Sequence, residues 1–430
     1  MPPRTIPRSE HPISRKNIDP DALKVLYRLY RSGHTAYLVG GGVRDLLLRR
    51  KPKDYDVVTS GRPSQIKKLF RNCRLIGRRF RLAHIHFAGG KLIEVSTFRR
   101  DPQDEGSDDL LVRNDNTFGG PMEDALRRDF TINGLFYDVG DFSLIDYVGG
   151  VDDLKRGVVR TIRDPWLRFQ EDPIRMIRAV KFASRLGFRI EKNTWEALVE
   201  SRAAVEKSPQ PRVHEEIARL LEEGSAARSL ELLDESGLLE YLEPNLEAYL
   251  RLAERGKIAS DRDGRLLYRL LEAVDRMRAE GRHLTRPTLF SACTYPLLVS
   301  EGLYESESPD LLVREGVVRM LHRLGLSKKD TERVQQVLLA QRKLRPRKRR
   351  RTFPRSFQSK SYFAESFALY EAVVRSTGEG KRELEEWKAR LDEKDLQPPS
   401  PHAEPDDDEA PMERQKLRRR RRRRRGGGTV

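Results

Sequence analysis

Three consecutive glycines, Gly40-Gly41-Gly42, constrain the fold more tightly than any other feature of the sequence. The apolar residues 36–39 before them predict a strand, and residues 43–48 after them predict a helix. Glycines let a backbone turn sharply and approach a phosphate closely, and the N-terminus of a following helix offers free amide donors to an anion. The pattern therefore predicts a strand, a glycine turn and a helix. The turn either binds a phosphate or is a plain connection between the strand and the helix.

Two aspartates, Asp54 and Asp56, follow the glycine turn within a second predicted strand, residues 54–58. In a strand, residues i and i+2 face the same side, with Cα atoms about 6.5 to 7 Å apart. Two such carboxylates suit a two-metal site occupied by Mg²⁺, which prefers oxygen ligands. By themselves the aspartates are more typical of a solvated turn. Their place directly after a phosphate-type turn favours catalysis and Mg²⁺ binding.

Glu94 is a candidate third carboxylate, inside the apolar stretch of residues 92–98. A buried, unpaired carboxylate is costly, so we expect it to have a partner. That partner is either a metal ion or an arginine such as Arg99.

Arginines that suit a triphosphate occur in two places. Arg44 lies in the first turn of the helix after the glycines, where its guanidinium can form a charged fork with phosphate oxygens. The second place is residues 127–133, Arg-Arg-Asp-Phe-Thr-Ile-Asn. Here Arg128 can hold phosphate while Asp129 contacts sugar or metal. The alternative is a cluster of surface ion pairs.

A possible base-reading face begins at Asp172. Pro173 fits the first turn of a helix, and Asp172, Arg175 and Arg178 then recur every three residues on one face. An aspartate can accept from an exocyclic amine while an arginine donates to the adjacent ring nitrogen. Adenine and cytosine present that pattern, whereas guanine and uracil present the reverse. The alternative is an N-cap acid with salt bridges along the helix.

The 430 residues suggest roughly two to four domains. Strand and helix patterns alternate to about residue 160, and helical patterns follow from Trp166. We therefore predict an α/β head with a mixed β-sheet, then all-α neck, body and tail domains, with disordered termini. The predicted boundaries are a flexible N-terminal arm 1–19, a head 20–165, a neck 166–225, a body and tail 226–395, and a disordered arginine-rich tail 396–430.

Charge indicates the class of partner. Lys and Arg number 84 against 66 Asp and Glu, a formal net charge of +18, which favours a polyanion. The alternative is a thermophile-like charged surface. We expect the basic runs 342–351 and 418–425 to bind the backbone of such a polyanion without sequence specificity.

Membrane association is not expected, because no apolar run of about 20 residues is present. The sequence also lacks a signal-peptide pattern. Its two cysteines, Cys73 and Cys293, are far apart and suit a reducing compartment. We therefore expect a cytoplasmic location.

Taken in order, these motifs resemble those of a known family. The series comprises Gly-Gly-Gly-Val-Arg-Asp (40–45), Asp54 with Asp56, the 127–133 motif, Asp-Tyr-Val-Gly-Gly (146–150) and Glu-Asp-x-x-Arg (171–175). It is similar to the series of the bacterial tRNA CCA-adding enzyme and poly(A) polymerase family, within the DNA polymerase β-like nucleotidyltransferases. Residues 69–84 and the arginine-rich C-terminal region resemble poly(A) polymerases of the poly(A) polymerase I type.

The resemblance implies a role for each candidate residue. Asp54 and Asp56 would bind Mg²⁺, with Glu94 and Asp129 as further catalytic acids. The residues matching nucleotide contacts are Gly40, Gly41, Arg44, Arg128, Asp172, Arg175 and Arg178. Two positions depart from the family pattern: Gly134 replaces a more usual Ala or Ser, and Lys181 stands where CCA-adding relatives often have Arg.

The resemblance further implies a template-independent polynucleotide adenylyltransferase that adds AMP from ATP to RNA 3′ ends. Its expected partners are RNA 3′ ends, ATP and RNA-decay or RNA-chaperone proteins. CCA addition to tRNA is the nearest alternative, because adenine and cytosine show the base-reading pair the same edge. A non-catalytic RNA-binding protein on a transferase scaffold is the second alternative.

Overall fold

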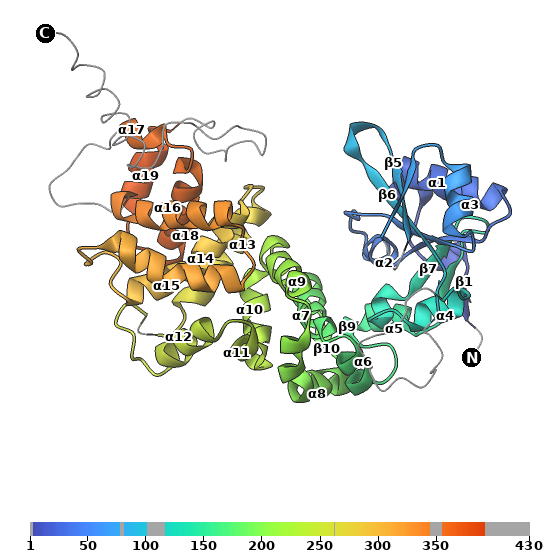
Figure 1. Ribbon diagram of the computed structural model, residues 1–430, viewed down its shortest axis with the longest axis horizontal. Helices are drawn as coiled ribbons and strands as arrows, with labels where there is room; N and C mark the ends of the chain where they lie inside the picture. Colours follow the sequence, from blue (N-terminus) through green and yellow to red (C-terminus); the bar gives the residue numbers. More distant parts are fainter. Residues whose placement is uncertain (1–2, 78–80, 101–116, 262, 345–354, 392–430) are drawn as a thin grey trace, which may run out of the picture. The chain divides into compact units, whose positions relative to one another are not determined.

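The computed structural model describes residues 3–77, 81–100, 117–261, 263–344 and 355–391 (Figure 1). They divide into two compact units. The first contains the described residues up to Leu252 together with Arg323–Gly325, and the second contains the remainder from Ala253. The predicted tail 396–430 and most of the basic run 342–351 lie outside the described residues.

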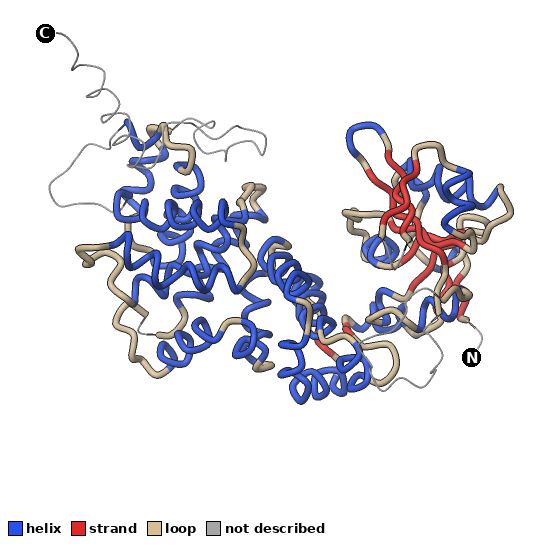
Figure 2. Tube along the Cα trace, in the orientation of Figure 1, coloured by secondary structure: helices blue, strands red, loops and turns tan. Residues whose placement is uncertain are grey.

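A mixed eight-stranded sheet forms the centre of the head (Figure 2). Its order is β1-β8-β7-β2-β3-β6-β5-β4, and β3 pairs parallel with β6 while the other neighbours pair antiparallel. The predicted mixed α/β head is confirmed. The strands are Arg4–Ile6 (β1), Ala36–Val39 (β2), Asp56–Thr59 (β3), Cys73–Ile76 (β4), Leu82–His86 (β5), Leu92–Thr97 (β6), Leu135–Asp138 (β7) and Leu144–Asp146 (β8).

Helices α1 and α3 cover one face of this sheet (Figure 1). Asp19 caps α1 by accepting from the backbone N–H groups of Asp21 and Ala22. The helices of the head are Pro20–Arg31 (α1), Gly41–Leu47 (α2), Pro63–Leu69 (α3), Pro121–Leu126 (α4) and Gly150–Arg156 (α5), with the short 3-10 helices Arg8–Glu10 (η1), Arg15–Asn17 (η2), Ala88–Gly90 (η3) and Thr131–Asn133 (η4).

The two faces of the sheet bury different cores. Val57 belongs to the large core beneath α1 and α3, whereas Val58 belongs to a smaller core on the opposite face with Val39 and Phe136. Because side chains alternate along a strand, Asp56 shares the face of Val58. The candidate carboxylates therefore lie on the side of the sheet away from α1 and α3.

The N-terminal segment is ordered, although the sequence predicted a flexible arm over residues 1–19. Strand β1 pairs antiparallel with β8 at the sheet edge. Ile13 and Ile18 are buried in the core beneath α1 and α3. The prediction was wrong for residues 3–19 because isoleucines without strand or helix periodicity can still pack into a core formed by distant segments.

The remainder of both units is mainly helical, as predicted. In the first unit, β9 (Val158–Val159) and β10 (Arg189–Ile190) form a small parallel pair. The helices there are Pro165–Glu171 (α6), Ile174–Leu186 (α7), Lys192–Ser201 (α8), Arg202–Lys207 (η5), Gln210–Glu222 (α9), Ala226–Glu235 (α10), Leu238–Leu242 (α11) and Pro244–Glu254 (α12), within which the division between units falls.

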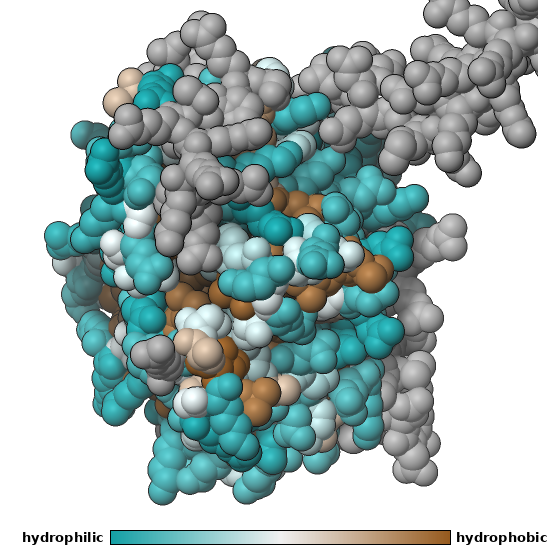
Figure 3. All heavy atoms as spheres, turned by 90° about the vertical axis from the view of Figure 1, so that its left-hand side faces the viewer, coloured by the Kyte–Doolittle hydropathy of each residue, from teal (hydrophilic) through white to brown (hydrophobic). Residues whose placement is uncertain are grey.

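The second unit packs its helices around aromatic side chains. Phe363 and Phe367 stack at a centroid distance of 6.1 Å, and both contact the buried ring of Trp387. The helices are Leu266–Ala279 (α13), Arg286–Ser300 (α14), Pro309–Arg323 (α15), Lys328–Leu344 (α16), Arg355–Gln358 (α17), Phe363–Thr377 (α18) and Lys381–Lys388 (α19). Hydrophilic residues cover most of the described surface on the face shown in Figure 3. Within the described residues, none of these helices combines the length and apolarity needed to span a membrane.

The Asp146–Gly150 motif has a structural role in the head. The Asp146 carboxylate accepts from four successive backbone N–H groups, those of residues 148–151, at 2.8 to 3.1 Å. A Cβ atom on Gly150 would lie 2.1 Å from the backbone oxygen of Thr131. The motif therefore holds α5 against η4 at a distance that a side chain would prevent.

We expect Gly150→Ala to lower the free energy of unfolding of the first unit by at least about 3 kcal/mol, because the contact is with backbone and cannot relax cheaply. Urea denaturation followed by circular dichroism would measure the loss. Gly120→Ala is the matched control, since its φ is −99° and its nearest neighbour would lie 3.8 Å away. Equal stability of the two variants would contradict the expectation.

Candidate nucleotide site

The glycine turn has an arginine beside each of its first two residues. Gly40 has a φ of 68°, a conformation that L side chains rarely adopt. A Cβ atom on Gly40 would lie 3.2 Å from Nη1 of Arg128, and one on Gly41 would lie 3.4 Å from Nη2 of Arg44. The predicted strand, turn and helix are confirmed by β2 and α2. The missing side chains let two guanidinium groups approach the turn.

Asp54 lies in the loop ahead of β3 rather than on the strand. The strand begins at Asp56, so the predicted same-strand spacing of the two aspartates was wrong. The backbone oxygen of Asp54 lies 3.3 Å from the position of a Cβ atom on Gly42. The loop therefore packs against the third glycine, which keeps Asp54 near the turn.

Strand register places Asp56 beside the turn and beside Glu94. Asp56 is paired with Val39, the last residue before the glycines, on one side and with Glu94 on the other. Paired residues on adjacent strands face the same side of the sheet. Glu94 is also 3.4 Å from Nε2 of His84, and its side chain is 45% exposed. The predicted burial of Glu94 was therefore wrong, and its side-chain partner is the imidazole of His84.

Electrostatics at Asp56 indicate crowded negative charge. Its side chain is reached by solvent, yet desolvation by surrounding protein raises its pKa to about 6, and the carboxylates of Glu94 and Asp54 add to the rise. Arg128 opposes it. A divalent cation would relieve this repulsion, so the donor set fits one. Within the described residues, no three His, Cys, Asp or Glu side chains are gathered closely enough to form a ready metal site.

Arg128 is held in place from the head. Its Nε and Nη2 donate to Oδ2 of the buried Asp124 at 3.2 and 3.0 Å. Its guanidinium lies over the Phe136 ring, with Cζ 5.4 Å from the ring centroid. Its Nη1 donates to the backbone carbonyl of Asn133 at 3.5 Å and lies beside Gly40.

Asp129 is engaged with protein groups on both carboxylate oxygens. It accepts from the backbone N–H of Phe130 at 2.8 Å and from Nδ2 of Asn133 at 3.0 Å. Nε and Nη2 of Arg178, on α7, lie 2.8 and 2.7 Å from its other oxygen. Burial acts to raise the pKa of Asp129, but Arg178 and these hydrogen bonds outweigh it and hold the pKa below its usual range.

The predicted base-reading residues have protein partners in the neck. Asp172 lies between α6 and α7 and forms a bidentate pair with Arg212, at 3.1 and 2.8 Å. Arg175 donates to the Arg168 carbonyl at 2.9 Å and to Glu171 at 3.2 Å. Arg178 reaches Glu216 as well as Asp129. The salt bridges considered for this face are therefore present.

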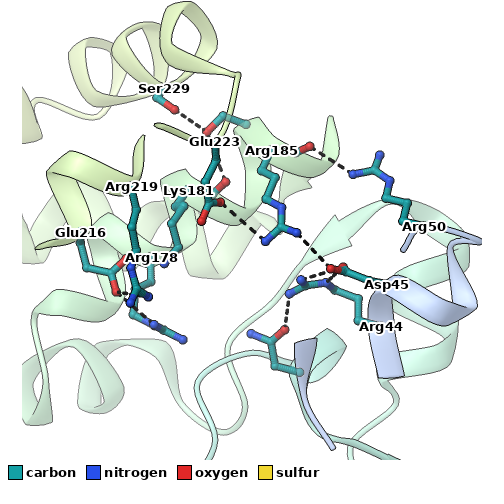
Figure 4. A network of polar contacts seen from close by, with 12 residues as sticks. Arg44, Asp45, Arg50, Arg178, Lys181, Arg185, Glu216, Arg219, Glu223 and Ser229 are labelled. Atoms are coloured by element: carbon teal, nitrogen blue, oxygen red, sulfur yellow. Dashed lines mark hydrogen bonds and ion pairs between the residues drawn. The ribbon is translucent and has the colours of Figure 1, made fainter. Parts of the chain in front are cut away.

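Arg44 is buried and fully oriented (Figure 4). Its Nε and Nη2 donate to Oδ1 of Asp45 at 2.9 and 2.8 Å, and its Nη1 donates to Oδ1 of Asn133 at 2.7 Å. The other Asp45 oxygen accepts from Arg185 of α7 at 3.0 Å. The arginine beside Gly41 is thus held by residues of both head and neck.

Four residues that the sequence reasoning did not select therefore support the site. Asp45 and Asn133 lie inside the recognised motifs, so their position was a usable signal. Arg168 donates to the backbone carbonyls of Arg127 and Arg128 at 2.6 and 2.7 Å and is buried. Neither Arg168 nor Arg185 stands out in the sequence, because only packing brings neck and head together.

Family models match two parts of the chain. The Poly A polymerase head domain matches residues 36–160. A model described as the probable RNA and SrmB-binding site of polymerase A matches residues 187–250.

Curated poly(A) polymerases I match over about 70% of the chain, and a curated CCA-adding enzyme matches over about half. Poly(A) polymerase I of Salmonella typhi is 48% identical over 304 residues, which are 68% of this chain and 64% of the relative. Poly(A) polymerase I of Haemophilus influenzae is 39% identical over 312 residues, 70% of this chain and 68% of the relative. The CCA-adding enzyme of Bacillus velezensis is 35% identical over 53% of this chain and 56% of its own length. The match spans just under two thirds of the first of these relatives.

Solved structures share the fold. The Bacillus stearothermophilus CCA-adding enzyme in complex with CTP aligns with a TM-score of 0.64 and 28% identity, covering 87% of this chain and 82% of that one. A tRNA nucleotidyltransferase complexed with a primer tRNA and an ATP analogue aligns with a TM-score of 0.58 at 23% identity, covering 85% and 98%. With the motifs, the mixed-sheet head and these similarities in agreement, the chain belongs to the poly(A) polymerase I family of nucleotidyltransferases.

Proposed function

We propose that this protein is a template-independent polynucleotide adenylyltransferase that adds AMP from ATP to RNA 3′ ends in the cytoplasm. The observation that carries the proposal is the strand register that sets Asp56 beside the glycine turn and Glu94 beside Asp56, with Arg44 and Arg128 against the turn. Carboxylates next to phosphate-binding groups are what phosphoryl transfer requires.

In the proposed reaction, the RNA 3′-hydroxyl loses its proton to water, and its oxygen forms a bond to the α-phosphorus of ATP. The bond from that phosphorus to the bridging oxygen of the β-phosphate breaks, and pyrophosphate leaves with the electron pair. Asp54 and Asp56 would hold Mg²⁺, with Glu94 as a candidate third carboxylate, and Mg²⁺ when bound lowers the pKa of the attacking hydroxyl and neutralises phosphate charge. Asp129 supports the site from its buried position, where it fixes Asn133.

Arg44 and Arg128 have complementary tasks in this proposal. Each is oriented by a buried aspartate, Asp45 or Asp124. Because the side chain is already ordered, binding the triphosphate costs less conformational entropy than it would for a flexible arginine. Each guanidinium retains N–H groups near Gly40 or Gly41 for the triphosphate. Preorganised donors of this kind stabilise developing charge without reorganising during the reaction.

Asp172 and Arg175 remain the proposed base-reading pair, with Arg178 contributing to nucleotide binding. Because Arg212 holds Asp172, an adenine amine must share that carboxylate with Arg212 or displace it. Arg178 already donates to Asp129 and Glu216, so it can bind a nucleotide only with N–H groups that these two carboxylates do not use.

CCA addition to tRNA is the second candidate, because a CCA-adding enzyme shares the fold and another, from Geobacillus, is 38% identical over 51% of the chain. The higher identity to poly(A) polymerases I, over more of the chain, favours poly(A) addition. A direct test offers the protein unstructured RNA with ATP, and separately tRNA lacking its terminus with CTP and ATP. We expect an adenylate ladder on the unstructured RNA. Extension that stops at CCA on tRNA alone would overturn the poly(A) proposal.

RNA is the proposed macromolecular partner, supported by the net charge of +18 and by the RNA-binding family model over residues 187–250. RNA-decay or RNA-chaperone proteins are proposed as further partners.

Deleting residues 414–425, which include eight successive arginines, should weaken RNA affinity and flatten its salt dependence. For single strands, each phosphate neutralised by Lys or Arg contributes about 0.7 to the slope of log K against log salt, so losing about four to seven such contacts changes the slope by about 3 to 5. RNA binding between 50 and 200 mM salt would measure it. Deletion of 397–405, which contains no Lys or Arg, is the control. If the deletion leaves the slope of log K against log salt unchanged, the electrostatic part of RNA binding comes from the two compact units instead.

A further inference from the structure

Two arginines of helix α7, seven residues apart, form ion pairs with the head, and Phe182 between them packs against Phe130 and under the Arg44 guanidinium. Arg178 lies in the first half of α7 and binds Asp129, and Arg185 lies in its last turn and binds Asp45. Seven residues make two helical turns, about 10.5 Å along one face. Two arginines on one face of the neck helix α7 therefore bind carboxylates of the head.

The two contacts are joined through the head by a continuous chain of hydrogen bonds. Asp129 accepts from Asn133, Asn133 accepts from Arg44, and Arg44 donates to Asp45. With α7 as the remaining side, these residues form a closed ring. The guanidinium beside the glycine turn is one member of the ring.

We infer that Arg185 is a positioning residue for Arg44, acting through Asp45, so that the neck helix sets the arginine that receives the triphosphate. This inference rests on the proposed function, since it assigns Arg44 to the phosphates. It extends that function by making phosphate binding depend on where α7 lies.

The Asp45 carboxylate is the connecting element. It is 3% exposed, and it gives one oxygen to Arg44 and the other to Arg185. A buried carboxylate oxygen that loses its hydrogen-bond donor costs free energy until it accepts from another donor. Without Arg185, the carboxylate can rotate both oxygens toward Arg44 and move it from the turn.

Arg185 is itself held from a second neck helix and from the head. Its Nη1 lies 3.6 Å from Glu223, just after α9, and its backbone carbonyl accepts from Nη1 of Arg50 at 3.3 Å (Figure 4). Arg50 thus touches the backbone of the same residue without touching Asp45 by its side chain. Arg50→Ala removes the same charge nearby and is a matched control.

The experiment measures binding of ATP and of inorganic tripolyphosphate by calorimetry at fixed Mg²⁺, using the full chain. Tripolyphosphate reports on the phosphate contacts alone. We expect Arg185→Ala to weaken both ligands about tenfold, the size of one lost charge-assisted contact. Arg185→Lys should recover most of the loss, and Arg50→Ala should stay within about twofold. In an Asp45→Asn background, Arg185→Ala should add no further loss.

Each other outcome is decisive. Equal binding of tripolyphosphate to the wild type and to Arg185→Ala overturns the inference while leaving the proposed function intact. A loss for ATP but not tripolyphosphate overturns it too, because the effect would then come through base or ribose. Absence of tripolyphosphate binding to the wild type overturns the phosphate role of the turn, and with it the inference. If Arg185→Ala fails to fold, Arg185→Lys and Arg185→Gln carry the same comparison.

Discussion

Replacing Asp56 with Asn should lower the rate of AMP transfer at least about 1000-fold while leaving RNA binding close to wild type. The carboxylate stands next to Glu94 at the start of β3, in register with the residue before the glycine turn. Asn keeps the shape but removes the charge that a divalent cation needs, and losing charge stabilisation of this kind typically costs about 10² to 10³ or more in rate. Single-turnover extension of a labelled RNA would measure it, with filter binding for RNA affinity.

Asp138→Asn is the matched control for this substitution. Asp138 is also a strand carboxylate whose pKa is raised by burial, but its oxygen accepts from the backbone of Gly140, away from the turn. We expect its rate within about twofold of wild type, and Asp54→Ala to behave like Asp56→Asn. If neither Asp54→Ala nor Asp56→Asn changes the RNA-extending activity of the preparation, that activity does not come from this site. Such a result would favour a non-catalytic RNA-binding protein.

Replacing Ile13 with Ala should destabilise the first unit by about 2 to 5 kcal/mol, the usual cost of truncating a fully buried isoleucine. Ile13 is 0% exposed and lies in the core beneath α1 and α3. That core also contains Val57, the neighbour of Asp56, so the lost unfolding free energy belongs to the same domain as the candidate site. Urea unfolding followed by circular dichroism would measure it.

Ile76→Ala provides the comparison, since Ile76 is 47% exposed on the edge strand β4 and should change stability by less than about 0.5 kcal/mol. A flexible N-terminal arm predicts that neither substitution matters. A cost at Ile13 below 0.5 kcal/mol would therefore restore the flexible-arm interpretation and contradict the structure.

Much of the site could be predicted because its elements are local. A strand, three glycines and a helix leave a pattern within about a dozen residues, and β2 and α2 follow it. The family motifs are also short and ordered along the chain, and the similarities to poly(A) polymerases I bear them out. The helical character beyond residue 166 was visible from the spacing of apolar residues.

Partners and exact placement could not be predicted in the same way. Asp54 was expected on a strand and lies before it. Glu94 was expected to be buried against a metal ion or an arginine such as Arg99, but it is half-exposed beside His84 of the neighbouring strand. The residues before α1 carry no periodicity, yet they pack.

Residue chemistry and short-range spacing thus determine which groups can bind phosphate, metal and base. The tertiary structure decides which of these groups meet. Asp45 and Arg185 are 140 positions apart, and Arg178 is 49 positions from Asp129, yet each pair is in contact. Ion pairs form wherever packing brings opposite charges into a low-dielectric site, and local sequence carries no information about that packing. The three glycines could therefore be recognised at once, but the arginine beside the second one depends on a helix from another part of the chain.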